Sequence, residues 1–457
     1  MTPSTPDEKL DFRRIFPVIF IVFVDLMALT IIIPILAYYG LAFNASPFTL
    51  GLLAASYPLM QFIGGPILGG LSDRFGRKPV LAVAQLGTFL SLLMLGFANS
   101  LWMIFVARLI DGVTGANLST AQAAITDITT PRTRSQGLGL IGAAFGLGFV
   151  LGPAISALAL ALSGNNYSAP AFVAAGFAFT SMMLTTFVFK ETLPPEKRNQ
   201  GSGGARRGVL AFGSMLDGLR KPVVGILFLV IFIHQQVFGA FQSMFSPFTL
   251  TRIGTNSFGN TLFFVYLGVA IVVVQGGLIG RLTRRFGERR LLITGLASVG
   301  VGMILMTFTP TLPVPWYQRD AIVEELSSQT GASGRELSQL DLLPSEDRRG
   351  WWGLIYLLVV MTPIAVGSGF IQPSVGSLIT QSVPAAEIGA VLGLSAAFQS
   401  LANVLAPLWA GAAFDFITPY APFLIGGITS TLLVIVTFNR LKPSANLPSA
   451  TQSAAAD

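Results

Sequence analysis

The sequence predicts an all-α membrane protein, with twelve transmembrane helices in two pseudo-symmetric six-helix bundles. Three observations predict this fold class. Hydrophobic residues make up 52% of the 457-residue chain and charged residues only 11%, whereas soluble domains average roughly 25% charged residues. Apolar segments long enough to cross a bilayer recur along the chain, and a short motif of the first half returns in the second.

Twelve apolar segments set the expected spans. A membrane helix needs about 20 mostly apolar residues. The segments of this kind cover residues 15–40, 48–70, 79–98, 101–126, 136–162, 170–189, 222–249, 257–280, 290–309, 351–380, 388–413 and 421–439. The apolar run after the polar residues 1–14 is too long for the core of a cleavable signal peptide, so we expect it to be the first span.

The basic residues predict the orientation of the chain. Twelve spans put both termini on one side, and 22 of the 28 Lys and Arg residues fall in the termini and loops of that side. Such an excess marks cytoplasmic loops. We therefore expect a multi-pass protein of the cell (inner or plasma) membrane with cytoplasmic N- and C-termini. The net charge of +7 then reflects topology and does not call for nucleic acid as a partner.

Composition also limits the chemistry. The chain has no cysteine and one histidine, which excludes disulfides and thiol chemistry and leaves little room for a metal centre. No nucleotide-binding loop or nucleophilic triad is visible. The sequence therefore predicts no enzyme, no metal and no cofactor.

The expected domains follow from the spans and the segments between them. They are an N-terminal six-helix bundle (1–189), a cytoplasmic linker (190–221), a C-terminal six-helix bundle (222–443) and a disordered tail (444–457). Pro194 and Pro195 end the sixth span. Within the linker, residues 208–219 have the pattern of a short interfacial helix.

Two repeats reveal an insertion in the second half. Residues 71–78 reappear as 282–289, and residues 150–153 reappear as 404–407. The two offsets are 211 and 254 residues, so about 40 residues are inserted between the second copies, and the polar stretch 310–349 accounts for them. We expect this stretch on the external side. It is interpreted either as a solvated cap or as a segment for substrate access or partner docking.

The stretch from Gly69 to Lys78 carries the most specific motif. Paired glycines permit close helix packing, Gly76 permits a tight reversal, and Asp73 precedes three basic residues. The whole stretch resembles the signature loop between the second and third helices of the major facilitator superfamily of transporters. An ordinary basic loop at a membrane surface is the alternative.

The resemblance implies that this motif is a conformational switch. Asp73 is expected to face the start of the eleventh span near Glu387, where helix amides carry partial positive charge. Arg77 is expected to pair with Asp127 at the cytoplasmic end of the fourth span. The second copy has Arg284 in place of Asp73, so only the first copy keeps the acid. The expected switch residues are Gly69, Asp73, Arg74, Gly76, Arg77, Lys78 and Asp127.

The fifth span is rich in glycine and ends in Gly152 and Pro153. This run resembles the antiporter signature of the same superfamily, although Ser156 and Ala157 replace its usual Gly-Gly. Plain helix packing is the simpler interpretation, with Gly148, Gly152 and Pro153 as the packing residues. Gly276, Gly277 and Gly280 of the eighth span are expected to form a matching surface.

Three charged residues are expected within spans, where charges are costly and usually functional. Asp25 and the sequence after it resemble the first span of tetracycline/proton antiporters, in which this acid matters for proton coupling. Arg108 and Asp111 are three residues apart and share a helix face, at a depth near that of Asp25. Two acids around one arginine leave one proton to exchange without stranding a charge. A structural salt bridge is the alternative.

Uncharged polar residues within spans are candidates for a substrate cavity. In the family that the motif resembles, the fourth, seventh and tenth spans line the cavity. The candidate residues on these spans are Asn117, His234, Gln235, Gln242 and Gln372. A single intramembrane histidine is also often only hydrogen-bonded in the interior.

The resemblance covers residues 15–440 and is strongest to the drug/proton antiporter branch, which includes tetracycline-resistance proteins. It implies proton-coupled export of small lipophilic or amphiphilic compounds by alternating access. The expected partners are a small-molecule substrate, protons and the lipid bilayer, and we expect a monomer. A proton-coupled symporter for a sugar or organic acid and a non-transporting membrane sensor remain as alternatives.

Overall fold

The structure is a computed structural model that describes residues 12–130, 133–198, 219, 222–329, 343–384 and 387–441. Twelve helical segments in these ranges are long and apolar enough to cross a membrane, which confirms the predicted fold class. The tail 444–457 and, apart from Leu219, the predicted interfacial helix 208–219 lie outside the described residues.

The N-terminal bundle contains six spans. Its helices are α1 (Phe12–Ala42), α2 (Pro47–Phe75), α3 (Arg77–Gly96), α4 (Leu101–Thr114), α5 (Asn117–Ile128), α6 (Arg134–Ser163) and α7 (Ser168–Phe187). Helices α4 and α5 form one span that is interrupted after Thr114. A short 3-10 turn, η1 (Pro195–Lys197), follows the bundle.

The C-terminal bundle repeats this plan with one additional helix. Its elements are α10 (Pro222–Ile253), α11 (Ser257–Val273), η2 (Val274–Leu278), α12 (Ile279–Phe286), α13 (Glu288–Met306), α14 (Arg319–Ser328), α15 (Trp352–Ser382), α16 (Ile388–Phe416) and α17 (Ala421–Arg440). Helices α11 and α12 form one span through the π-helical turn η2. Helix α14 lies outside the spans, within the predicted insertion.

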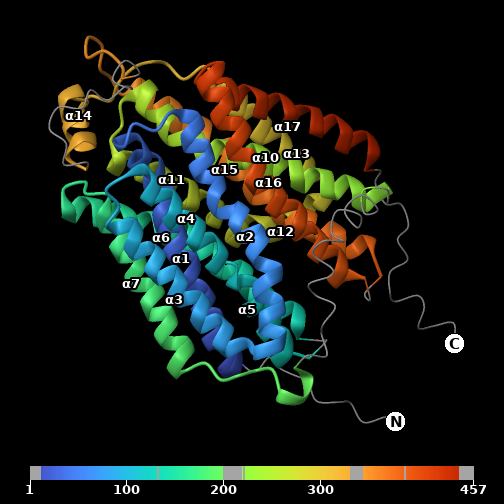
Figure 1. The fold of residues 1–457 in the computed structure, drawn as a ribbon. Helices are drawn as coiled ribbons and strands as arrows, with labels where there is room; N and C mark the ends of the chain where they lie inside the picture. Colours follow the sequence, from blue (N-terminus) through green and yellow to red (C-terminus); the bar gives the residue numbers. More distant parts are fainter. Residues whose placement is uncertain are drawn as a thin grey trace.

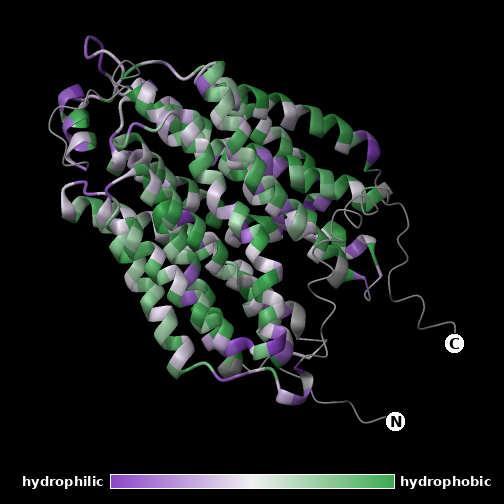
Figure 2. Ribbon diagram, viewed as in Figure 1, coloured by the Kyte–Doolittle hydropathy of each residue, from purple (hydrophilic) through white to green (hydrophobic). Residues whose placement is uncertain are grey.

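The long helices are apolar on nearly all sides, as expected of spans that contact both lipid and other helices. Leu162, Phe187 and Phe308 are at least two-thirds exposed, and such side chains suit a lipid-facing surface. Figure 2 shows hydrophobic residues along the flanks of the helices in both bundles. Within each helix the backbone N–H and C=O groups bond to one another, as they must in a bilayer core that offers no water.

The two bundles converge at the end of the molecule that carries α14, here called the α14 end (Figure 1). Helices α2 and α16 meet there backbone to backbone, because a Cβ on Gly51 would lie 2.3 Å from the carbonyl oxygen of Pro407. The Phe48 amide donates to Asp415 Oδ2 at 3.2 Å. The Asn260 side chain donates across the same boundary to the Pro34 carbonyl at 3.1 Å.

The bundles spread apart toward the opposite end, here called the basic end because it carries the repeated basic motif (Figure 1). Among the described residues, a Cβ added to Gly69, Gly142 or Gly280 would meet nothing within 4 Å. The structure is therefore closed at the α14 end and open at the basic end.

This arrangement corrects one expectation about the fifth and eighth spans. Gly276, Gly277 and Gly280 do not form a surface that matches α6, since none of them has a described neighbour within 4 Å of an added Cβ. The close approach lies nearer the α14 end, where a Cβ on Gly268 would be 2.7 Å from the Phe149 carbonyl oxygen. The reason is the divergence of the bundles toward the basic end.

The repeated motif forms the same turn twice. Gly76 joins α2 to α3 with φ 103° and ψ 160°, and Gly287 joins α12 to α13 with φ 78° and ψ 157°. Each glycine amide donates to the carbonyl four residues earlier, Ser72 and Thr283 respectively. Residues 69–75, expected in a loop, instead continue helix α2, and Gly76 alone makes the reversal.

These matched turns generate a stability prediction. Gly76→Ala and Gly287→Ala should both be destabilising, by about 1–3 kcal/mol, because this backbone region is essentially restricted to glycine. Gly76→Ala should cost more, since its Cβ would also lie 2.3 Å from Glu191 Oε2, whereas Gly287 has no described neighbour within 4 Å. Thermal unfolding of the two variants in detergent measures the difference. Equal losses would show that Glu191 does not crowd Gly76.

Candidate functional site

The centre of the N-terminal bundle contains a buried ion pair on α4. Arg108 Nη1 lies 2.8 Å from Asp111 Oδ2, and both side chains are about 5% exposed. The spacing of three residues places them on one face of the helix. Gly112 allows α2 to pack closely here, because a Cβ on it would lie 2.4 Å from the Tyr57 carbonyl oxygen.

Tyr57 on α2 completes the surroundings of the arginine. The Arg108 guanidinium lies 4.6 Å from the centre of the Tyr57 ring, a cation–π contact that strengthens when water is excluded. Tyr57 is also within electrostatic range of Asp25 and Asp111. Sequence reasoning identified the three charges but missed Tyr57, whose only signal was an aromatic residue in an apolar span.

The break between α4 and α5 lies one turn from this ion pair. Gly115 ends α4, and its carbonyl accepts a hydrogen bond from Gln61 Nε2 at 3.2 Å. Gln61 Nε2 also donates to the Tyr57 hydroxyl at 3.3 Å. A side chain from α2 thus satisfies a carbonyl that the break exposes, as an interrupted membrane helix requires.

Asp25 lies near the middle of α1, where its residue is partly buried. Helix α6 packs against the next turn of α1 through two of the predicted packing glycines. Thr30 Oγ1 donates to the Gly148 carbonyl at 2.8 Å, and a Cβ on Gly152 would lie 2.0 Å from that hydroxyl oxygen. Pro153 follows within α6. These contacts fix the part of α1 that carries Asp25.

Polar residues of α10 and α16 lie between the two ends of the C-terminal bundle. Gln235 Nε2 donates to Asn403 Oδ1 at 2.7 Å, and Trp409 Nε1 donates to Gln236 Oε1 at 2.7 Å. Trp409 was not predicted, although an indole N–H within a span needs an acceptor of this kind.

The other predicted cavity residues have varied surroundings. His234 is 5% exposed and its ring stacks on Phe238 with centroids 6.1 Å apart. Gln242 is partly buried, and its Nε2 has no hydrogen-bond partner within the described ranges. Gln372 on α15 is exposed. Asn117 begins α5, and its side chain lies outside the described part. Their role in a cavity stays a prediction.

The motif at the basic end forms a compact charge cluster around Arg77. The Arg77 side chain, 8% exposed, lies 2.6 Å from Asp73 Oδ1 and 3.1 Å from Asp127 Oδ2. It also donates to Ser72 Oγ at 2.7 Å. The expected pairing of Arg77 with Asp127 is present. The remaining cations of the motif lie at the edge of this cluster. The Arg74 guanidinium is 5.2 Å from the Phe75 ring centre.

One expected contact of the motif is absent from this arrangement. Asp73 is 36% exposed and pairs with Arg77 rather than with the described start of α16 near Glu387. The physical reason is that the bundles are separated at the basic end, so α16 begins beyond the reach of α2.

Glu191 is a member of this cluster that sequence reasoning did not assign. Its carboxylate accepts from the amides of Arg77 at 2.9 Å and Lys78 at 3.2 Å. These amides begin α3, where a negative charge is favoured by the helix dipole. The available signal was an acid directly after the sixth span.

The described ranges contain no group of three or more His, Asp or Glu side chains arranged to hold a metal ion.

Comparisons with known proteins agree with this geometry. The sequence profile of the Major Facilitator Superfamily matches residues 18–322. The chain is 31% identical over 291 residues to the tetracycline resistance protein, class B, of Escherichia coli, covering 63% of this chain and 71% of that protein. It is 28% identical over 346 residues to multidrug resistance protein 2 of Bacillus subtilis (strain 168), covering 72% and 84% of the two chains.

The fold also resembles a solved transporter structure. The human organic anion transporter MFSD10 (TETRAN) superposes with a TM-score of 0.62 over 95% of this chain and 100% of that chain, at 21% identity. At this identity the likeness concerns the fold alone.

The buried ion pair generates a second stability prediction. Asp111→Asn leaves Arg108 without its counter-ion and should destabilise the protein by about 3–5 kcal/mol, whereas Arg108→Leu combined with Asp111→Leu should recover much of the loss. Thermal unfolding in detergent measures both. Arg349→Gln, which breaks the half-exposed pair with Glu346, is the control and should change little. A stable Asp111→Asn variant would contradict the assigned pairing.

Proposed function

The chain belongs to the major facilitator superfamily, and we propose that it exports small lipophilic or amphiphilic compounds in exchange for protons. The observation that carries the proposal is the buried ion pair of Arg108 and Asp111 in the N-terminal bundle, and the partly buried Asp25 on α1 is the acid proposed to act with it. The similarity to proteins named tetracycline resistance and multidrug resistance proteins supports drug-like substrates.

These residues provide a physical basis for coupling to protons. Arg108 already has one carboxylate partner, Asp111, at 2.8 Å. A second carboxylate nearby adds a negative charge that one proton neutralises. Asp25 is the group proposed to bind and release that proton, because it lies on α1, a helix that also bonds to the opposite bundle through the Pro34 carbonyl. The proton is then the only coupling ion, and no cofactor takes part.

Alternating access follows from the two ends of the molecule. We place the basic end in the cytoplasm, because most Lys and Arg residues belong to it. The structure then represents the state open to the cytoplasm, in which a substrate enters between the bundles. Gln235, Gln242, Gln372, His234 and Asn117 are the proposed cavity residues.

The motif at the basic end is the proposed conformational switch. In the cytoplasm-closed state, Asp73 would approach the amides at the start of α16, while Asp127 keeps Arg77 in place. In the present state Arg77 holds both carboxylates. The switch and the cavity lie within one chain, and the proposed working unit is a monomer.

Transport in proteoliposomes tests the proposed function. Protein is reconstituted with tetracycline, tetraphenylphosphonium or a sugar outside, and protein-free vesicles report passive uptake. Uptake into acid-inside vesicles indicates proton antiport, whereas uptake into alkaline-inside vesicles indicates symport. We expect antiport of tetracycline or the lipophilic cation by the wild type. For Asp25→Asn, we expect the pH gradient to drive no more uptake than is seen in protein-free vesicles.

The matched control is Asp320→Asn, which neutralises an exposed acid on α14 and should transport as the wild type does. Flux that ignores both the pH gradient and the loss of Asp25 would refute proton coupling at this residue. Absence of flux for every compound would favour the sensor alternative.

A further inference from the structure

We propose that α14 latches the two bundles together at the external side, with Glu325 as the gating residue. This inference rests on the alternating access proposed above, because a latch matters only if the α14 end must open. It gives the insertion 310–349 a specific role in place of a solvated cap.

The start of α14 is attached to the C-terminal bundle. The Val314 amide donates to the Ile253 carbonyl, which ends α10, at 3.0 Å. The Tyr317 ring packs directly on Gly254, where a Cβ would lie 2.3 Å from the ring. The Arg319 amide donates to Glu346 at 2.6 Å and holds the pKa of that carboxyl below its usual range. Helix α14 should therefore move with the C-terminal bundle.

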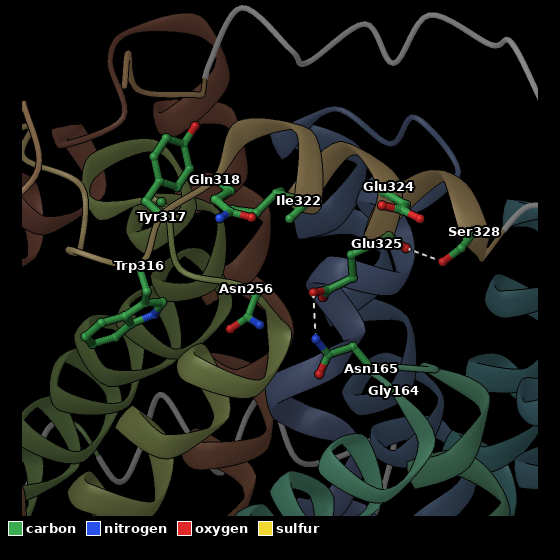
Figure 3. Close-up of a pocket in the computed structure, with 12 residues that line it drawn as sticks. Gly164, Asn165, Asn256, Trp316, Tyr317, Gln318, Ile322, Glu324, Glu325 and Ser328 are labelled. Carbon is green, nitrogen blue, oxygen red and sulfur yellow. Dashed lines mark hydrogen bonds between the residues drawn. The ribbon is translucent and has the colours of Figure 1, made fainter. Parts of the chain in front are cut away.

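The other end of α14 reaches the N-terminal bundle through Glu325. One carboxylate oxygen accepts from Asn165 Nδ2 at 2.9 Å, and the other accepts from the Tyr167 hydroxyl at 2.8 Å. The second oxygen also accepts from the Ser257 amide of the C-terminal bundle at 3.2 Å. Figure 3 shows Glu325 pointing toward Asn165. One charged acceptor thus joins donors from both bundles, and such bonds are stronger than neutral ones.

Gln329, the residue directly after α14, provides a second connection to the same loop. Its Oε1 accepts from the Tyr167 amide at 2.9 Å, and its Nε2 donates to the Asn165 carbonyl at 3.3 Å. Both ends of the amide are used, and both partners belong to the short loop between α6 and α7. The contact therefore recognises the backbone of this loop as well as its side chains.

The receiving loop is held in position by its own bundle. Tyr167 is fully buried, and its ring packs edge-on against Tyr38 and Tyr39. Burial raises the pKa of the Tyr167 hydroxyl well above its usual value, so it stays a donor. Gly164 and Asn165 adopt positive φ angles of 67° and 62°, which turn the chain toward α14. Glycine and asparagine tolerate this conformation best.

The latch also has a means of release. A pocket of about 400 Å³ lies beside it, between α14 and the loops that carry Asn165 and Asn256 (Figure 3). Its walls include the side chains of Gln318 and Glu324. Water entering from this side can replace the hydrogen bonds to Glu325 as the bundles separate. Opening the α14 end must part Glu325 from Asn165 and Tyr167, whereas the bond from Ser257 can persist within its own bundle.

Distance measurements between spin labels test the latch directly. The chain lacks cysteine, so labels can be placed at Asn99→Cys and Phe308→Cys, two exposed positions at the α14 end of the N- and C-terminal bundles. The protein is measured in detergent without substrate or pH gradient. We expect the wild type to show mainly the short, closed distance. We expect Glu325→Gln to raise the ratio of the long to the short distance about tenfold, from the loss of a charged acceptor.

Two further variants make the result specific. Asp320→Asn neutralises an exposed acid on the same helix, outside the pocket, and should leave the distances unchanged. Tyr167→Phe removes one donor while keeping the buried ring, and should shift the distances in the same direction by less.

If Glu325→Gln showed the same distances as the wild type, the proposed latch would be wrong, whether or not its thermal stability changed. Because the measurement uses neither substrate nor protons, this failure is separate from failure of the proposed function. If Glu325→Gln showed the expected shift but the wild type did not export in response to a proton gradient, only the proposed function would be contradicted.

Discussion

The charge of Arg108 is the constraint around which the N-terminal bundle is built. A guanidinium in the middle of a membrane span is costly unless other protein groups replace its hydration. Asp111 supplies the counter-charge at 2.8 Å, and the Tyr57 ring covers the guanidinium. The helix break at Gly115 lies beside the same group, and its carbonyl is satisfied by Gln61 next to that ring. A second acid near this pair would have to bind a proton or leave a net charge within the membrane, and Asp25 is the acid proposed for that role.

The ends of the molecule are controlled by different contacts. At the α14 end, Gly51 and Gly411 let α2 and α16 touch through their backbones, and polar bonds such as that of Glu325 add to the closure. At the basic end, Gly76 makes a rigid reversal, and the charges gather around Arg77 within one bundle. A rocking motion requires this difference. The contacts at one end join the two bundles, and the contacts at the other end stay within one bundle.

Much of the fold could be predicted because its signals are local. Apolar length placed the spans, and the repeated motif placed the equivalent turns at Gly76 and Gly287, which have nearly the same dihedral angles. The pairing of Arg108 with Asp111 followed from helical spacing alone. These features depend on a few neighbouring residues and hold in any state of the protein.

Other features could not be predicted because they depend on how the bundles sit together. One sequence must serve both an open and a closed basic end, so it does not reveal that Asp73 pairs with Arg77 here or that Gly280 has no close neighbour. The bond between Tyr167 and Glu325 joins residues 158 positions apart across an insertion, and no periodic pattern marks it.

The proposed export depends on Asp25 binding the coupling proton in the bundle that contains the Arg108–Asp111 pair. Infrared difference spectroscopy of the purified protein, titrated with acid in the absence of substrate, observes carboxyl protonation most directly. We expect a band from a protonated carboxyl that grows with acid in the wild type and is missing from Asp25→Asn. The same band in both proteins would contradict this expectation.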